Sequence, residues 1–270
     1  MRAVLQTARR RRPIASPFVQ HRRRVLLVTA VALSALAAAC GGGGRPTLDR
    51  KATASPSTSP TTLPSFVSLI ARVRVPNIAV YDTPASPSPS KSFANPWPLN
   101  NDPKLPVELV FLVEQRQGPW LKVLLPIRPN GTTGWVHARD VALQEDQFHI
   151  TVELHAHRLT VYNGDAVMLS DTVAVGMPAT PTPTGTYFIR VLLKAPDPTT
   201  VYGPYAYGLS GHSEALDTFD GGDAELGIHG NNDASVLGTD ASHGCIRMSN
   251  DKITSLAGVL PLGTPVTITA

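Results

Sequence analysis

The 270-residue sequence has few cysteines, few aromatic residues and almost no long apolar runs. With only Cys40 and Cys245, no network of disulfides can hold the fold together, and no CxxC pair is present to begin a structural zinc site. Aromatic residues make up 6% of the chain, whereas it has 25 prolines and 21 glycines, which indicates many turns and short strands. We therefore expect a mainly β fold.

Acidic residues are absent from residues 1–39, which contain eight arginines. The whole chain has 24 Lys and Arg against 20 Asp and Glu, so residues 40–270 keep 16 basic against 20 acidic residues. The net charge of +4 therefore becomes −4 once the N-terminal segment is set aside. Because the positive charge is confined to that segment, we expect no nucleic-acid partner.

The N-terminal segment is typical of a targeting signal. An arginine-rich stretch precedes the 15-residue apolar run VLLVTAVALSALAAA, and Cys40 follows at once. Small residues before a cysteine resemble the lipobox of bacterial lipoproteins, although Ala37 stands where leucine is usual. We expect residues 1–39 to be a signal peptide, and acyl chains on Cys40 to anchor the exported protein to the outer face of the membrane, facing the cell wall. An uncleaved signal anchor is the alternative.

The rest of the chain divides by composition into a tether and two β-rich parts. In residues 41–65, 17 of 25 residues are Gly, Pro, Ser or Thr, so we predict a disordered tether over 40–65 with a span of roughly 25–30 Å. Residues 66–145 alternate short apolar runs with turn signals, and GPWLKVLLP followed by NGTTGWV resembles bacterial Src-homology-3-like barrels. The insert at residues 84–106 is predicted to be a loop.

Residues 148–270 are predicted to form a mostly antiparallel sheet with one short helix. Apolar and polar residues alternate from Phe148, and Asn-Gly-Asp at 163–165 suits a tight hairpin. Ser249 precedes a predicted helix at residues 250–259. His155 and His157 are expected on one face of a strand, where we interpret them as solvated side chains and not as metal ligands.

The chemistry is predicted to lie in the stretch GIHGNNDASVLGTDASHGCIRMSN. If Cys40 is acylated, Cys245 is the only remaining thiol, and a thiol needs a base to become a strong nucleophile. His229 and His243 are both available as that base. Gly244 favours a turn in which backbone N–H groups point at one spot, as an oxyanion hole requires. Zinc is the competing interpretation of two histidines and one cysteine, but no second cysteine completes the ligand set.

These residues resemble the L,D-transpeptidase family, whose YkuD-type catalytic domain carries IHG followed by SHGC and a short apolar residue. The chain has Ile228-His229-Gly230 and then SHGCIR at residues 242–247, while TPTPTGTYFI and LGTPVTI resemble further family segments. The resemblance implies a β-sandwich at residues 148–270, with Cys245 as nucleophile and His229 as base. It also implies supporting roles: site shaping and oxyanion binding for Gly230, Ser242, His243 and Gly244, and substrate binding for Arg247, Tyr202 and Tyr205.

The family implies a reaction on peptidoglycan without a metal or an organic cofactor. Cys245 would form a thioester with a donor tetrapeptide stem, releasing D-alanine, and an acceptor stem would resolve the thioester into a 3→3 cross-link. Water as acceptor would instead make an L,D-carboxypeptidase. A papain-like peptidase is disfavoured because His229 precedes Cys245 in the chain. A noncatalytic wall-binding lipoprotein remains the alternative from another class, and we expect a monomer in each case.

Overall fold

The computed structural model of the chain describes residues 66–99, 104–219 and 222–270, which belong to one compact unit. Cys40 and the predictions for the signal peptide and tether lie outside the described residues. Within these ranges, no helix is both long enough and apolar enough to span a membrane. The prediction of a mainly β fold is confirmed, because strands dominate and the structure describes a single α-helix.

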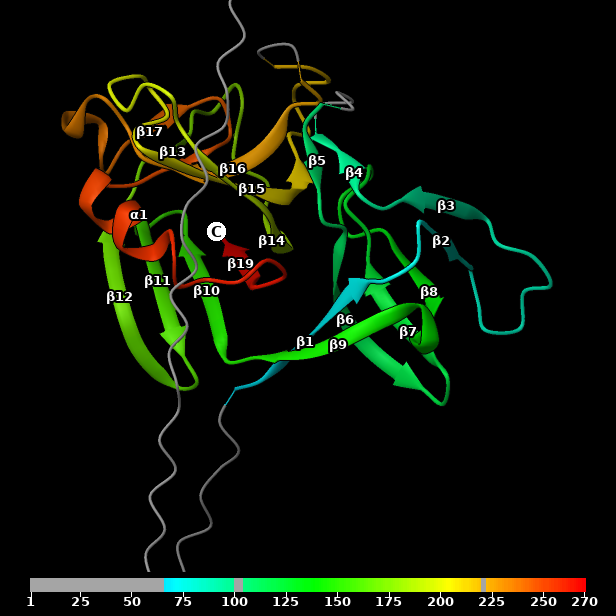
Figure 1. Cartoon of the computed structure of the whole chain (residues 1–270). Coiled ribbons are helices and arrows are strands. Elements are labelled where there is room, and N and C mark those ends of the chain that lie inside the picture. The colour runs from blue at the N-terminus through cyan, green and yellow to red at the C-terminus, as the bar shows by residue number, and fades with distance from the viewer. Residues whose placement is uncertain (1–65, 100–103, 220–221) are drawn as a thin grey trace, which may run out of the picture. The chain divides into compact units, whose positions relative to one another are not determined.

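The first part of the fold is built on a five-stranded antiparallel sheet with the order β8-β7-β6-β1-β9 (Figure 1). Its strands are β1 (Ser68–Val73), β6 (Val110–Gln117), β7 (Trp120–Leu124), β8 (Thr133–His137) and β9 (Val141–Asp146). A short 3-10 helix, η2, spans Ala138–Asp140. Alternate residues of β8 and of most of β7 are buried, and the sheet packs on a core that includes Ile70, Phe111 and Leu121.

The predicted loop at residues 84–106 contains short strands. Strand β2 (Asn77–Val80) pairs with β3 (Lys91–Ala94), and β4 (Trp97–Pro98) pairs with β5 (Pro106–Val107). Proline removes backbone donors, which hid this pairing in the sequence pattern. Phe93 nevertheless joins the buried core, and this apolar anchor explains why the insert is ordered there.

The second part is an eight-stranded sheet with the order β12-β11-β10-β19-β14-β15-β16-β18. Two of its seven pairings, β10 with β19 and β16 with β18, are parallel and the others antiparallel. Its strands are β10 (Phe148–Glu153), β11 (Arg158–Asn163), β12 (Ala166–Thr172), β14 (Gly185–Lys194), β15 (Tyr205–His212), β16 (Glu225–His229), β18 (Ile246–Arg247) and β19 (Pro265–Thr269). A small sheet pairs β13 (Val175–Gly176) with β17 (Asp240–Ser242), and η3 spans Ala234–Val236.

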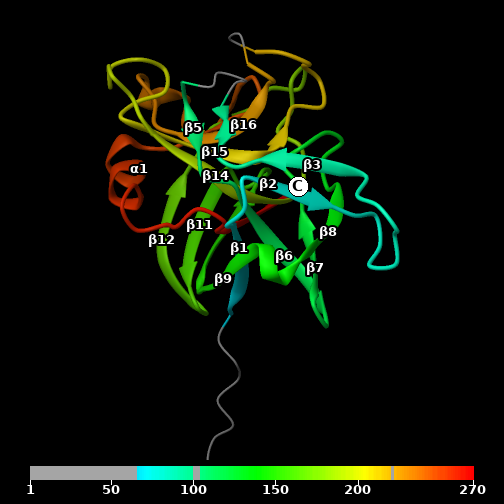
Figure 2. The ribbon, with the colours of Figure 1, turned by 45° about the vertical axis from the view of Figure 1, so that its right-hand side comes forward.

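The two halves of this sheet form two layers around one core. Figures 1 and 2 show β10, β11 and β12 in one layer and β14, β15 and β16 in the other. The core draws from both layers, with Val152 and Val161 on one side and Tyr207 and Ile228 on the other. Helix α1 (Asn250–Leu256) closes this core, and the buried hydroxyl of Tyr207 donates a hydrogen bond to the Leu256 carbonyl at 2.6 Å.

The two parts of the fold share packing and a buried carboxyl group at their junction. A Cβ on Gly263 would lie 2.4 Å from Cγ2 of Ile70, so the second part approaches β1 at a point where only glycine fits. Asp146, at the end of β9, accepts hydrogen bonds from the Phe148 N–H at 2.9 Å and the Thr264 hydroxyl at 2.7 Å. Burial raises the pKa of Asp146 despite these bonds.

Three local predictions for the second part differ from the structure. The helix ends at Leu256, three residues before the predicted end. The Ser249 hydroxyl does not cap it but donates to Asp171 at 2.8 Å. His155 and His157 lie in the turn between β10 and β11 and not on a strand face, and Nε2 of His157 lies 2.8 Å from Oδ1 of Asp240. This long-range partner explains why the chain turns earlier than its alternation suggests.

Candidate active site

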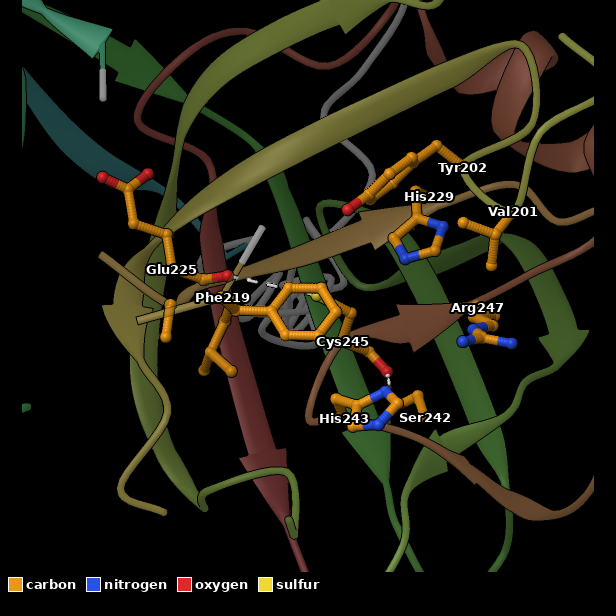
Figure 3. Close-up of a pocket in the computed structure, with 11 residues that line it drawn as sticks. Val201, Tyr202, Phe219, Glu225, His229, Ser242, His243, Cys245 and Arg247 are labelled. Atoms are coloured by element: carbon orange, nitrogen blue, oxygen red, sulfur yellow. Dashed lines mark hydrogen bonds between the residues drawn. The ribbon is translucent and has the colours of Figure 1, made fainter. Parts of the chain in front are cut away.

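The adjacent strands β16 and β18 bring the two predicted reactive residues together. His229 ends β16, and Cys245 directly precedes β18. These strands run parallel, with Ile228 opposite Ile246 and His229 opposite Arg247. His229 and Cys245 therefore line one pocket although 15 residues separate them in the chain (Figure 3).

The pocket opens beside a larger groove of about 570 Å³. His229 and Cys245 border both, and the groove continues past Ala206 and Leu193 toward Leu99 of the first part. The pocket is completed by Val201, Tyr202, Phe219, Ala224, Glu225, Leu226, Ser242, His243 and Arg247. The groove therefore gives a ligand a path to the thiol.

The Cys245 thiol is half-buried, and no disulfide holds it. Its sulfur lies 4.0 Å from the main-chain oxygen of Glu225, to which the S–H donates. Burial raises the pKa of Cys245, while a backbone hydrogen bond from Gly227 and the charge of Arg247 act in the opposite direction. The resting group is therefore a thiol, and it requires a base to become nucleophilic.

His229 has the protonation and orientation that such a base requires. Its side chain is buried, and Nδ1 lies 2.7 Å from the main-chain oxygen of Gly230. Since a carbonyl can only accept, Nδ1 carries the proton and Nε2 keeps its lone pair. Burial lowers the pKa of His229 to about 4, helped by the charge of Arg247 and opposed by hydrogen bonds to the backbone. The imidazole is neutral near pH 7.

Two buried hydroxyl groups fix the turn that carries Cys245. The Ser242 hydroxyl donates to the Cys245 carbonyl at 2.5 Å and accepts the Gly244 N–H at 3.1 Å. The Thr182 hydroxyl donates to the Gly244 carbonyl at 2.9 Å and accepts the Gly176 N–H at 2.8 Å. Gly244 has φ +116°, a conformation that residues with a side chain rarely adopt. The shaping role predicted for Ser242 and Gly244 thus has a definite geometry.

The same contacts narrow the predicted oxyanion site. The prediction included the N–H groups near His243, Gly244 and Cys245, but the Gly244 N–H already donates to Ser242. The N–H groups of His243 and Cys245 remain as candidates. They lie on either side of Gly244 in the turn that carries the sulfur, where backbone N–H groups could bind an oxyanion.

A second set of contacts fixes the strand that carries His229. The side chain of Asn250 makes two hydrogen bonds to the main chain of Asn231, each at 2.9 Å. Its Oδ1 accepts the Asn231 N–H, and its Nδ2 donates to the Asn231 carbonyl. Nδ2 of Asn231 also donates to the Met248 carbonyl at 2.7 Å. A Cβ on Gly230 would lie 2.3 Å from Oδ1 of Asn250, so this close approach requires glycine.

The predicted substrate-binding residues do not all line the pocket. The Tyr202 ring lies 5.1 Å from the His229 ring and forms part of the wall. Arg247 lines the pocket, and its buried Nε has no hydrogen-bond partner. Tyr205 is not among the lining residues, because it packs on the core, and its main-chain oxygen accepts the Gly230 N–H. The substrate-binding role of Tyr205 stays a prediction.

His243 is exposed and stands against Phe219, with 5.3 Å between ring centroids. Sequence reasoning missed Phe219 and Glu225 as pocket residues and Thr182 as a support, because none belongs to the SHGC motif. The Thr-Pro run that contains Thr182 was the one available signal. Within the described ranges, no group of three or more His, Cys, Asp or Glu side chains could hold a metal ion.

The part of the chain that carries this site is similar to a domain found in other proteins. The model of the L,D-transpeptidase catalytic domain, YkuD, matches residues 147–268. YkuD of Bacillus subtilis, named as an L,D-transpeptidase, is 36% identical over 121 residues, which cover 45% of this chain and 65% of that protein. Its namesake in Bacillus licheniformis is 34% identical over 122 residues, covering 45% and 66%.

The chain thus spans less than two thirds of the length of either Bacillus protein. Among solved structures, an L,D-transpeptidase from Mycobacterium smegmatis is 16% identical with a TM-score of 0.38, covering 60% of this chain and 90% of that one. The family match and the two Bacillus relatives confirm the resemblance identified from IHG and SHGC. Residues 147–268 of this chain are thus similar to the L,D-transpeptidase catalytic domain, YkuD.

Proposed function

We propose that the protein is a peptidoglycan L,D-transpeptidase that joins stem peptides by 3→3 cross-links through a thioester on Cys245. The observation that carries the proposal is the pairing of a free thiol with a neutral histidine in one pocket. A hydrogen bond from Nδ1 of that histidine to the Gly230 carbonyl leaves Nε2 as the base. The YkuD-type domain and the adjoining groove supply the context for a peptide substrate.

The first half of the proposed reaction transfers the donor stem to the enzyme. The sulfur of Cys245 attacks the carbonyl carbon of the third residue of a tetrapeptide stem while Nε2 of His229 takes the thiol proton. A C–S bond forms and the carbonyl electrons move onto oxygen. When the carbonyl reforms, the C–N bond to the terminal D-alanine breaks, and the departing amine receives the proton from His229.

The second half reverses the roles with a different amine. The side-chain amine of the third residue of a neighbouring stem attacks the thioester carbon, and His229 takes its proton. The C–S bond breaks, a new amide forms, and the sulfur recovers a proton. Because one acyl group is exchanged between two nitrogens, the balance needs no ATP, oxidant or cofactor.

Electrostatics of the pocket favour these steps. The charge of Arg247 lowers the pKa of both Cys245 and His229, so it favours the thiolate and the unprotonated imidazole together. In the proposal, the N–H groups of His243 and Cys245 hold the oxyanion. Arg247 can also bind a substrate carboxylate, since its guanidinium lines the pocket and its Nε has no partner there.

The remaining roles follow from the sequence. We propose that residues 66–145 form a Src-homology-3-like barrel, supported by their five-stranded antiparallel sheet and by a core built mainly from their own residues. We further propose that the exported protein is a monomeric lipoprotein anchored through Cys40. The tether at residues 40–65 would then let the catalytic domain reach wall polymer near the membrane.

The test is to incubate the purified protein with tetrapeptide muropeptides and to measure the products by mass spectrometry. A cross-linked dimer with loss of D-alanine is the expected result. Tripeptide without dimer would show that water is the acceptor and would replace the proposal by an L,D-carboxypeptidase. Binding to wall material without either product would support a noncatalytic wall-binding protein.

A further inference from the structure

One wall of the catalytic pocket is a hairpin whose position depends on the first part of the fold. The wall hairpin, residues 212–225, joins β15 to β16, and its described residues 212–219 and 222–225 include Phe219 and Glu225. The Phe219 ring lies against His243, and the main-chain oxygen of Glu225 accepts the Cys245 S–H. Moving this hairpin would therefore change both the pocket wall and the surroundings of the sulfur.

The wall hairpin makes few bonds across itself among its described residues. The N–H of Ser213 donates to the Ala224 carbonyl at 2.9 Å, and Phe219 and Gly222 exchange two main-chain bonds. The Ser213 hydroxyl accepts the N–H groups of Ala215 and Leu216. Carbonyl groups on both limbs are left to find donors elsewhere.

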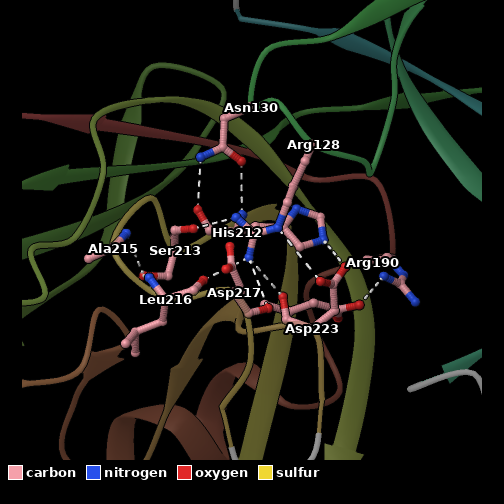
Figure 4. A network of polar contacts seen from close by, with 10 residues as sticks. Arg128, Asn130, Arg190, His212, Ser213, Ala215, Leu216, Asp217 and Asp223 are labelled. Carbon is pink, nitrogen blue, oxygen red and sulfur yellow. Dashed lines mark hydrogen bonds and ion pairs between the residues drawn. The ribbon is translucent and has the colours of Figure 1, made fainter.

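Arg128 supplies those donors from outside the catalytic domain (Figure 4). It lies in the connection between β7 and β8. Its guanidinium donates to four main-chain carbonyls of the hairpin: Ser213 at 2.5 Å, Leu216 at 2.9 Å, Asp217 at 3.5 Å and Asp223 at 3.2 Å. Nε also lies 3.6 Å from Oδ1 of Asp223. The planar guanidinium of arginine has five N–H donors, so it can bond both limbs of the hairpin at once. A lysine ammonium is a compact point charge and cannot reach as many acceptors in this geometry.

Asn130, two residues further, fixes the base of the same hairpin. Its Nδ2 donates to the His212 carbonyl at 2.8 Å, and its Oδ1 accepts the His212 N–H at 2.9 Å. His212 is buried, and its Nε2 lies 3.3 Å from Oδ2 of Asp223. Main-chain and side-chain contacts therefore connect the two limbs at their base, beside Arg128 (Figure 4).

A buried ion pair continues this set of contacts to the pocket. Arg190 of β14 donates to the carboxylate of Glu225 at 2.5 Å, and its side chain is only 3% exposed. Glu225 is also the residue whose main-chain oxygen lies under the sulfur of Cys245. The hairpin is thus held at its base by Asn130 on the His212 limb and by Arg190 on the Glu225 limb, and across its limbs by Arg128.

We propose that Arg128 is a positioning residue for the catalytic pocket, acting through the wall hairpin from the first part of the fold. The inference rests on the proposed function, and it gives residues 66–145 a direct part in the reaction beyond spacing or wall binding. Arg128 makes its bonds to one segment, the hairpin, and not to the strands of the catalytic sheet. A contact that merely joined the two parts would not need to span both limbs.

The test compares Arg128→Ala and Arg128→Lys with Arg116→Ala, an exposed arginine of the same sheet that bonds only within its own turn. Hydrogen exchange is measured on peptides covering residues 212–226, together with alkylation of Cys245 by iodoacetamide and turnover of tetrapeptide muropeptides. We expect faster exchange in the hairpin, altered alkylation, and a fall in turnover of about 10- to 100-fold for Arg128→Ala. Arg128→Lys should lie between wild type and Arg128→Ala, and Arg116→Ala should match wild type.

A double-mutant cycle with Phe219→Ala separates positioning from general stability. If Arg128 acts through the hairpin, the double variant is no slower than the slower single variant. Additive losses in turnover, or unchanged exchange in the hairpin, would overturn the inference. If Arg128→Ala fails to fold, Arg128→Lys provides the same cycle. Exchange and alkylation need no stem peptide, so an inactive wild-type protein would contradict the proposed function while leaving the role of Arg128 measurable.

Discussion

Two sides of the catalytic pocket are held in different ways. The side that carries Cys245 and His229 is fixed by the side chains of Ser242, Thr182 and Asn231, which are buried and come from the same domain. The wall hairpin at residues 212–225 is held chiefly by groups from the first part of the fold, and side chains such as Arg128 and Asp223 are 33% and 55% exposed. Cys245 and His229 are thus held by buried contacts within their own domain. The wall hairpin depends on contacts with the first part of the fold, and these are partly exposed to solvent.

Replacing the base should have the largest effect on the reactive side. His229→Gln removes the lone pair at Nε2 but keeps a polar side chain of similar reach, so we expect turnover to fall by about 10²- to 10⁴-fold. Steady-state assays with tetrapeptide muropeptides would measure this. His157→Gln, in a turn outside the pocket, is the matched control and should keep wild-type turnover. Comparable activity in both variants would contradict the assignment of His229.

Loss of a supporting hydroxyl should weaken the reactive side through stability. Thr182→Val leaves the Gly176 N–H and the Gly244 carbonyl without their buried partner, which should lower the free energy of unfolding by about 1–3 kcal/mol and slow turnover. Denaturant unfolding would measure the change. Thr267→Val on the exposed face of β19 should be nearly neutral. If the two variants were equally stable, the Thr182 hydroxyl would not support the turn.

The pH dependence of the free energy of unfolding should reveal the shifted pKa of the buried His229. The pKa of His229 is lowered to about 4 from an ordinary value of 6.5, so the folded protein resists a proton that the unfolded chain accepts. Its contribution to stability is therefore complete above pH 6.5 and decreases as pH falls from 6.5 toward 4, by up to about 1.4 kcal/mol per pH unit. Unfolding at several pH values should show this slope reduced in His229→Gln. The base should likewise remain unprotonated in the resting enzyme well below pH 6.5.

Raising the salt concentration should produce the smallest effect, a faster hydrogen exchange in the wall hairpin alone. The partly exposed pair of Arg128 and Asp223 is screened at high ionic strength, at a cost of less than about 1 kcal/mol. Hydrogen exchange at low and at ~1 M NaCl should therefore speed up in residues 212–226 and stay constant around Cys245. Equal acceleration in both regions would mean that the two sides of the pocket are not held differently.

The turn that carries Cys245 could be anticipated from the sequence because its residues are close together in the chain. Cys245, Ser242 and Gly244 form one turn, and Gly230, for which the resemblance implied a site-shaping role, directly follows His229 and accepts a hydrogen bond from its imidazole. The strands of the second part were visible for the same local reason, since alternation reports which face is buried.

Contacts across long stretches of chain were not predictable. The Thr182 hydroxyl bonds a carbonyl 62 residues away, and Arg128 reaches carbonyls 85 to 95 residues away. The sequence around Thr182 or Arg128 does not indicate which carbonyl groups these side chains will bond. Tyr205, expected from the resemblance to bind substrate, packs on the core through contacts that its local sequence does not reveal.

The central claim, a thioester on Cys245, is tested most directly by the intact mass of the protein during incubation with a tetrapeptide stem. The wild-type protein should gain the mass of the stem without its terminal D-alanine, and Cys245→Ala, at equal thermal stability, should gain none and give no product. A mass increase or turnover that persists in Cys245→Ala would contradict the account.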